Sequence, residues 1–150
     1  MNYRMSFMSL LLLFWLTSFS QTVTEKKLPN SIIFEKTNYG LIFTNILVNG
    51  KEVKAMIDFG DQHYLQLSST LVGRLGLAIE PAGYQVADVY GNTYDVNQGT
   101  LNKLKVGNWQ NESVEFTSQA GEMESVSEQI GTEFNAVVGW GYFKEYFTLH

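Results

Sequence analysis

The sequence contains no cysteine, and this absence limits how the protein can be stabilised. Disulfide bonds, metal sites built on thiolates and a lipid-modified N-terminal cysteine are all excluded. Stability must therefore come from a hydrophobic core, which a chain of 150 residues is long enough to bury. The length also indicates one globular domain, and no cofactor is expected.

Positive charge is also scarce in this chain. There are 10 Lys and Arg residues against 15 Asp and Glu residues, a formal net charge of −5 at pH 7, and no basic cluster. Nucleic-acid binding depends on basic side chains that neutralise phosphates. We therefore expect no nucleic-acid partner, although the acidic balance does not identify another partner.

The longest apolar run lies at the N-terminus. Arg4 precedes the run from Phe7 to Leu16, and small residues stand before Gln21. This order is typical of a secretory signal peptide, and a transmembrane helix needs a longer run, of about 20 residues. We expect a signal peptide over residues 1–20, a polar leader over residues 21–31, and a secreted or periplasmic protein without a membrane partner. An uncleaved membrane anchor is the alternative.

The next stretch reads as a β-hairpin that ends in a carboxylate. Leu41 to Val48 is an apolar, β-branched run, and Asn49-Gly50 follows it. This pair favours a tight hairpin turn because both residues tolerate positive φ. Val53 to Ile57 predicts the returning strand. That strand ends at Asp58-Phe59-Gly60, so a carboxylate is delivered to a loop at the tip of a buried strand.

A short helix is predicted after this loop, over Ser69 to Leu75. The side chain of Ser68 can cap it by accepting from free backbone N–H groups of the first turn. Gly76 can end it in a left-handed conformation.

The middle of the chain reads as further strands. A first strand is expected to begin at Ile32 to Phe34, before the hairpin, and Glu80-Pro81-Ala82-Gly83 indicates a break. Tyr84 to Val106 predicts a second hairpin, with its turn at Tyr90-Gly91-Asn92-Thr93. Residues 101–106 and 113–117 are expected to pair around another turn.

The C-terminal part alternates polar and apolar segments. Gly121 to Gly131 is acidic and polar, so it predicts a solvated loop. Phe134 to Val138 is a short apolar run, as in a buried strand. Gly141 to Tyr146 predicts a helical turn, and Phe147 to His150 the start of a strand.

In this order, the elements resemble the retropepsin-like aspartic proteases, in the small bacterial branch of that superfamily. The resemblance covers Ile32 to His150 and implies an all-β, single-lobe closed barrel with one short helix. The family usually continues past this point, so the sequence leaves open a short protein or a truncated one. The matching positions are Asn49-Gly50, Asp58, Gly60, Leu67-Ser68, Leu75-Gly76-Leu77 and the run from Ala136 to Phe143.

The resemblance also implies roles for particular residues. Asp58 corresponds to the catalytic carboxylate, and Gly60 shapes its loop. The hairpin tip at Tyr90, Gly91 and Asn92 corresponds to the flap that folds over the cleft.

Two residues of the active-site loop depart from the family pattern. Phe59 replaces a Thr whose hydroxyl bonds across the dimer, and two Phe rings at a two-fold axis would wedge the loops apart or must point elsewhere. Asp61 replaces a small residue, and we expect it to add negative charge beside the catalytic carboxylates.

Aspartic proteolysis requires two carboxylates that share one proton, because like charges so close together cannot both ionise. The chain has one Asp-x-Gly, so a homodimer must bring two copies of Asp58 together. We therefore expect a homodimeric endopeptidase that takes an extended peptide or protein substrate as an added strand.

Other functions remain open from the sequence. A catalytically inactive module that binds a peptide or partner is the main alternative, and a structural domain of a larger assembly is the third. Asp58, Asp61 and His63 are metal ligands by type, but His63 reads as a surface-loop residue and no metal site is expected. Trp140 is expected in the core or at the dimer interface.

Overall fold

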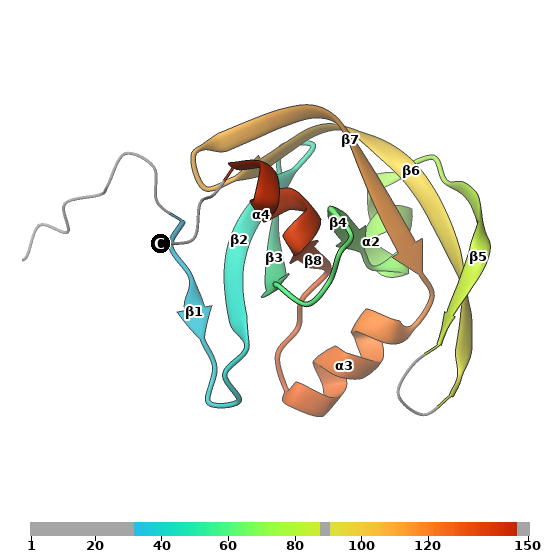
Figure 1. The fold of residues 1–150 in the computed structure, drawn as a ribbon, viewed down its shortest axis with the longest axis horizontal. Helices are drawn as coiled ribbons and strands as arrows, with labels where there is room; N and C mark the ends of the chain where they lie inside the picture. The colour runs from blue at the N-terminus through green and yellow to red at the C-terminus, as the bar shows by residue number, and fades with distance from the viewer. Residues whose placement is uncertain (1–31, 88–90, 147–150) are drawn as a thin grey trace, which may run out of the picture.

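The computed structural model of the chain describes residues 32–87 and 91–146 (Figure 1). The predicted signal peptide, the leader, Tyr90 of the flap turn and the strand from Phe147 to His150 lie outside these residues. No helix within them is both long enough and apolar enough to cross a membrane. The elements are β1 (Glu35–Lys36), β2 (Ile42–Val48), β3 (Lys51–Asp58), β4 (Leu65–Leu67), α2 (Ser69–Leu75), β5 (Glu80–Ala87), β6 (Thr93–Val106), β7 (Trp109–Gln119), α3 (Glu122–Ile130), β8 (Ala136–Gly139) and α4 (Trp140–Tyr146).

Six of the strands close into a barrel, in the hydrogen-bonded order β2-β3-β8-β4-β7-β6. β6 returns to β2, where Ile46 is opposite Val106 and Val48 is opposite Leu104. β1 extends the sheet from β2, and β5 extends it from β6, on opposite sides of the barrel (Figure 1). The prediction of an all-β closed barrel is therefore confirmed.

The predicted hairpin forms β2 and β3. Its turn has positive φ at both Asn49 (48°) and Gly50 (81°), and Ile46 is paired with Val53. Because side chains alternate along a strand, Ile46 and Val48 face the barrel interior while Phe43 packs in a cluster of its own.

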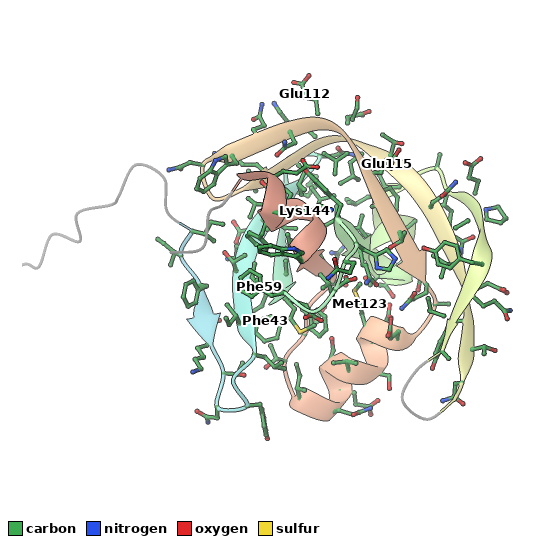
Figure 2. All side chains as sticks on the ribbon, in the orientation of Figure 1. Phe43, Phe59, Glu112, Glu115, Met123 and Lys144 are labelled. Atoms are coloured by element: carbon green, nitrogen blue, oxygen red, sulfur yellow. The ribbon has the colours of Figure 1, made fainter. Side chains whose placement is uncertain are left out.

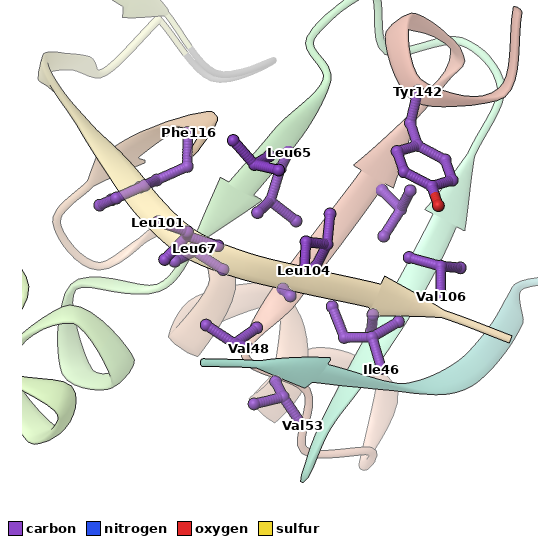
Figure 3. Close-up of a cluster of buried hydrophobic side chains, with 14 of the residues drawn as sticks. Ile46, Val48, Val53, Leu65, Leu67, Leu101, Leu104, Val106, Phe116 and Tyr142 are labelled. Atoms are coloured by element: carbon purple, nitrogen blue, oxygen red, sulfur yellow. The ribbon is translucent and has the colours of Figure 1, made fainter. Parts of the chain in front are cut away.

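Apolar side chains from several strands fill the barrel (Figure 3). β4 contributes Leu65 and Leu67, and β6 contributes Leu104 and Val106, all of them buried. Tyr142 points from α4 into the same core and is fully buried (Figure 3). Residues of β3 and α4 belong to this core. These two elements position the candidate site.

Two of the helices were expected from the sequence. α2 spans Ser69–Leu75, Ser68 Oγ accepts from the backbone N–H of Leu71 at 3.1 Å, and Gly76 ends the helix in a left-handed conformation. α4 is the predicted helical turn, one residue longer at its start. With α3, the barrel carries three short helices among the described residues instead of one.

The segment from Gly121 to Gly131 contains the helix α3, so the prediction of a solvated loop is wrong. Its apolar residues Met123, Val126 and Ile130 lie on one helical face and pack with Phe43 in a second cluster (Met123 and Phe43 in Figure 2). Three glutamates make the segment polar overall, so the helical spacing of its apolar residues is not evident from the sequence. A narrow apolar stripe is enough for a helix whose stability comes from packing.

Three strand boundaries also differ from the predictions. β5 already begins at Glu80, where a break was predicted, because an irregular register between Pro81 and Gln85 lets an edge strand accept the proline. β6 runs unbroken from Thr93 to Val106. β1 covers only Glu35–Lys36 and not Ile32 to Phe34.

Candidate active site

Asp58 is the last residue of β3. The strand pairs in parallel with β8, where Asp58 is level with Gly139, and in antiparallel with β2. Neighbours on both sides hold the end of the strand, so the following loop starts from a defined position. The side chain of Asp58 is half-buried. The barrel thus presents one carboxylate at its rim.

The chain turns sharply directly after Asp58. The backbone N–H of Gly60 donates to Asp58 Oδ1 at 2.8 Å, and the N–H of Asp61 reaches the Asp58 carbonyl oxygen at 3.3 Å. A Cβ on residue 60 would lie 3.1 Å from Asp58 Oδ1, so a side chain there would crowd the carboxylate. Glycine lets the backbone amide orient the carboxylate through a charge-assisted hydrogen bond.

Phe59 points away from this turn, toward α4 (Figure 2). Its ring centroid lies 5.3 Å from that of Phe143 and 6.2 Å from that of Trp140. The side chain is nevertheless 48% exposed. It lines an apolar hollow of about 360 Å³, together with Ile32, Phe34, Ile42, Ile57, Trp140 and Phe143.

The carboxylate of Asp61 is engaged inside its own loop. Oδ1 accepts from the backbone N–H of His63 at 2.9 Å and from His63 Nδ1 at 2.7 Å. Oδ2 accepts from Gln66 Nε2 at 2.6 Å. Only 12% of the Asp61 side chain is exposed. Its charge is therefore directed at His63 and Gln66 and does not stand free beside Asp58.

The start of α4 packs directly behind this loop. The N–H of Trp140 donates to the Asp61 carbonyl oxygen at 2.6 Å. Two glycines make this approach possible. A Cβ on Gly139 would come within 2.7 Å of the Asp61 carbonyl oxygen, and one on Gly141 would lie 2.8 Å from the His63 carbonyl oxygen.

The predicted flap is the hairpin of β5 and β6. Gly91, with φ of 85°, and Asn92 are exposed at its described tip. In the middle of β5, the Tyr84 hydroxyl lies 3.4 Å from His63 Nε2, so the hairpin approaches the loop that follows Asp58. His63 also lines a polar hollow of about 280 Å³ between β4, β6 and β7.

The structure brings together residues that the sequence reasoning did not connect. His63 was assigned to a surface loop and Tyr84 to a strand of the second hairpin, and Gln66 was given no role. The Asp61-x-His63 spacing was an available signal, because an Asp side chain often bonds the backbone N–H two residues on. Among residues 32–87 and 91–146, no three His, Asp or Glu side chains are placed to hold a metal ion.

Comparisons with known proteins bear on the family and the fold of this chain. A family model described as "Aspartyl protease" matches residues 44–134. A retropepsin-like aspartic protease from Rickettsia conorii is similar in structure, with a TM-score of 0.59 and 17% identity over 80% of this chain and 91% of that chain. The EIAV protease, complexed with the inhibitor HBY-793, gives a TM-score of 0.51 and 12% identity over 71% and 91%. No curated protein sequence matches the chain.

The family match begins in β2 and ends just before β8, so it spans more than half of the chain. It includes Asp58, the loop after it and the hairpin of β5 and β6. The two solved structures share the barrel and, at their low identity, bear on the fold alone. The chain therefore belongs to the aspartyl protease family and has the retropepsin-like fold.

Proposed function

We propose that this protein is an aspartic endopeptidase that works as a homodimer, with Asp58 as its catalytic carboxylate. The observation that carries the proposal is the placement of Asp58 at the end of β3, with its Oδ1 bound by the N–H of Gly60. This hydrogen bond fixes the orientation of the carboxylate. Proton transfer to and from a water molecule requires such a fixed orientation.

The reaction needs a second carboxylate close to the first. One accepts a proton from the attacking water while the other donates a proton to the carbonyl oxygen of the peptide bond. Each chain contributes one Asp-x-Gly, so the second carboxylate is the Asp58 of a second copy. The titration then belongs to the pair and not to either residue.

The apolar hollow beside Phe59 supports a second copy as its occupant. Phe59 is 48% exposed and Phe34, which also lines the hollow, is 58% exposed. Apolar surface of this kind, next to the loop that must meet its symmetry mate, is typical of an interface. Because the Phe59 ring packs against Trp140 and Phe143 of its own chain, it does not have to separate the two loops of a dimer.

The substrate is an extended peptide, which would lie as an added strand between Asp58 and the hairpin of β5 and β6. Phe59, Gly60 and Asp61 form the loop beneath it, and the hairpin tip, of which Gly91 and Asn92 are described, forms the flap above it. Secretion or export to the periplasm, after removal of residues 1–20, completes the proposal and follows from the N-terminal sequence pattern alone.

Cleavage of a peptide library tests this function. The protein starting at Gln21 is incubated at acid and neutral pH as wild type, Asp58→Asn and Glu52→Gln. Glu52 is an exposed carboxylate at the other end of β3, so it controls for the loss of one charge. We expect cleavage by wild type and Glu52→Gln and none by Asp58→Asn. Equal cleavage by all three would assign the activity to another site or a contaminant.

Binding without hydrolysis is the second candidate, and Phe59 favours it because the family's Thr hydroxyl is missing. A folded, dimeric wild type that binds peptides from the library but cleaves none of them would establish this function instead.

A further inference from the structure

We propose that Asp61 is a positioning residue, which holds the Asp58 loop from within its own protomer. In the resemblance described above, a Thr hydroxyl reaching across the dimer performs this task. The inference rests on the proposed function where it concerns catalysis. Its structural part concerns only this loop and can be measured in the absence of any activity.

The side chain of Asp61 closes the loop onto β4. Its two oxygens accept three hydrogen bonds of 2.6–2.9 Å, two from His63 and one from Gln66. Bonds to a charged acceptor are stronger than neutral ones, and this carboxylate is largely shielded from water. Gln66 belongs to β4, which pairs with both β7 and β8, so the anchor is part of the barrel wall.

The backbone of Asp61 closes the same loop onto α4. Its carbonyl oxygen accepts from the N–H of Trp140, and its own N–H returns to the Asp58 carbonyl oxygen. Asp61 therefore joins Asp58, β4 and the start of α4. No hydroxyl is present at position 59 to do this from the opposite chain, and the Phe59 ring is turned toward α4.

The arrangement also determines the tautomer of His63. A carboxylate oxygen 2.7 Å from Nδ1 requires the hydrogen on Nδ1. In the neutral ring, Nε2 is then the acceptor, and it faces the Tyr84 hydroxyl of the flap hairpin. The tautomer is a spectroscopic signature of the Asp61 contact, and it is independent of catalysis.

Hydrogen exchange measures the proposal directly. Exchange rates are measured in wild type and in Asp61→Ala for the backbone amides of Gly60, His63 and Trp140. The amides of β6 serve as the internal reference in each protein. In Asp61→Ala we expect the exchange rates of these three amides to rise by about tenfold or more relative to those of β6, because the substitution opens the loop locally. Val126→Ala weakens the α3 cluster without changing the Asp58 loop itself, and it controls for a general loss of stability. Glu52→Ala is the matched control for the lost carboxylate. Glu52 is exposed, and it accepts a hydrogen bond from the side-chain amide of Asn45 as Asp61 does from that of Gln66.

Three further variants test the same hydrogen bonds, including the case in which Asp61→Ala does not fold. Asp61→Asn retains one carbonyl oxygen for His63, and its amide can donate to a reoriented Gln66, so we expect exchange close to wild type. If Asp61→Ala does not fold, His63→Ala and Gln66→Leu remove its partners one at a time, and each should loosen the loop partially. Nitrogen NMR of His63 should report the Nδ1–H tautomer in wild type and lose that preference in Asp61→Ala.

The outcomes separate this inference from the proposed function. Unchanged exchange at the three amides in Asp61→Ala, or in both partner variants, overturns the inference. If wild type cleaves peptides, Asp61→Ala should lower kcat by about a hundredfold with KM nearly unchanged, and an unchanged kcat also overturns it. A loosened loop in a protein that cleaves nothing supports the positioning of the loop and counts against the proposed function.

Discussion

At the scale of single residues, Phe59 is the most informative position. The sequence left two possibilities for its ring, to wedge two loops apart at a two-fold axis or to point elsewhere. In the structure the ring contacts Trp140 and Phe143 of the same chain. The loop is held through Asp61, so the missing hydroxyl at position 59 does not leave it without support.

This arrangement predicts the effect of Phe59→Thr. Two aromatic contacts are lost, each contributing about 0.5–1.5 kcal/mol, so we expect a loss of about 1–3 kcal/mol in the free energy of unfolding. The added hydroxyl should raise peptide cleavage by less than about tenfold, because the loop is already positioned. Urea unfolding and cleavage rates measure the two effects. A gain near a hundredfold would mean that Asp61 does not hold the loop.

Gly139 is a second decisive residue. A Cβ there would press on backbone oxygens of Asp61 and His63, which cannot move without disturbing the loop. We expect Gly139→Ala to reduce the free energy of unfolding by about 1–3 kcal/mol, the usual cost of overpacking.

The matched control is Gly73→Ala in α2. A Cβ at Gly73 meets nothing within 4 Å, and alanine favours the helix by roughly 0.5–1 kcal/mol. Chemical denaturation of both variants gives the comparison. A Gly139→Ala protein as stable as wild type would show that the loop and α4 are less tightly packed than described.

At the scale of elements, α3 depends on packing more than on its own sequence. Its mixed polar surface gives little intrinsic stability, and helices of nine residues rarely persist alone. Met123 is 4% exposed and lies against Phe43 and Phe134 in the second cluster. The helix is therefore stable only because the barrel offers an apolar face to cover.

Met123→Ala tests this dependence. We expect the free energy of unfolding to fall by about 2–4 kcal/mol, the range for truncating a buried Met. Gln129→Ala, on the exposed face of the same helix, should change it by less than about 0.5 kcal/mol. Thermal or urea unfolding distinguishes them. Similar small effects for both variants would contradict the packing of α3 on the barrel.

At the scale of the whole molecule, one chain supplies one Asp-x-Gly, which is half of the catalytic site that we propose. The second half requires a dimer, and the hollow beside Phe59 is the surface that we assign to it. Its apolar lining and the exposure of Phe59 and Phe34 support this assignment. The oligomeric state in solution decides between an endopeptidase and a binding module.

Sedimentation at micromolar concentration should show a dimer of the protein that starts at Gln21. Phe34→Asp places a charge on the rim of the hollow and should raise the dimer dissociation constant by about tenfold or more. Tyr39→Asp is the control, because Tyr39 is 77% exposed and does not line the hollow. A strictly monomeric wild type would leave no route to a pair of Asp58 carboxylates.

The N-terminal pattern predicts processing of the whole chain. In the native host, the mature protein should begin at or near Gln21, because the run from Phe7 to Leu16 has the length and flanks of a signal peptide. N-terminal sequencing of the exported protein checks this. An intact Met1 in a membrane fraction would favour the uncleaved anchor.

The sequence by itself determined the features that depend on neighbouring residues. The turn at Asn49-Gly50, the cap at Ser68 and the end of α2 at Gly76 all follow from local backbone preferences. The order of strands around Asp58 was sufficient to identify the family and the closed barrel.

Only the tertiary structure decided the features that depend on distant partners. α3 became a helix because Phe43, nearly eighty residues earlier, gives its apolar face a partner. Asp61 became an anchor because Gln66 and the N–H of Trp140 approach it, and the sequence showed only an added charge. Packing and buried hydrogen bonds join residues far apart in the chain, so local patterns do not contain them.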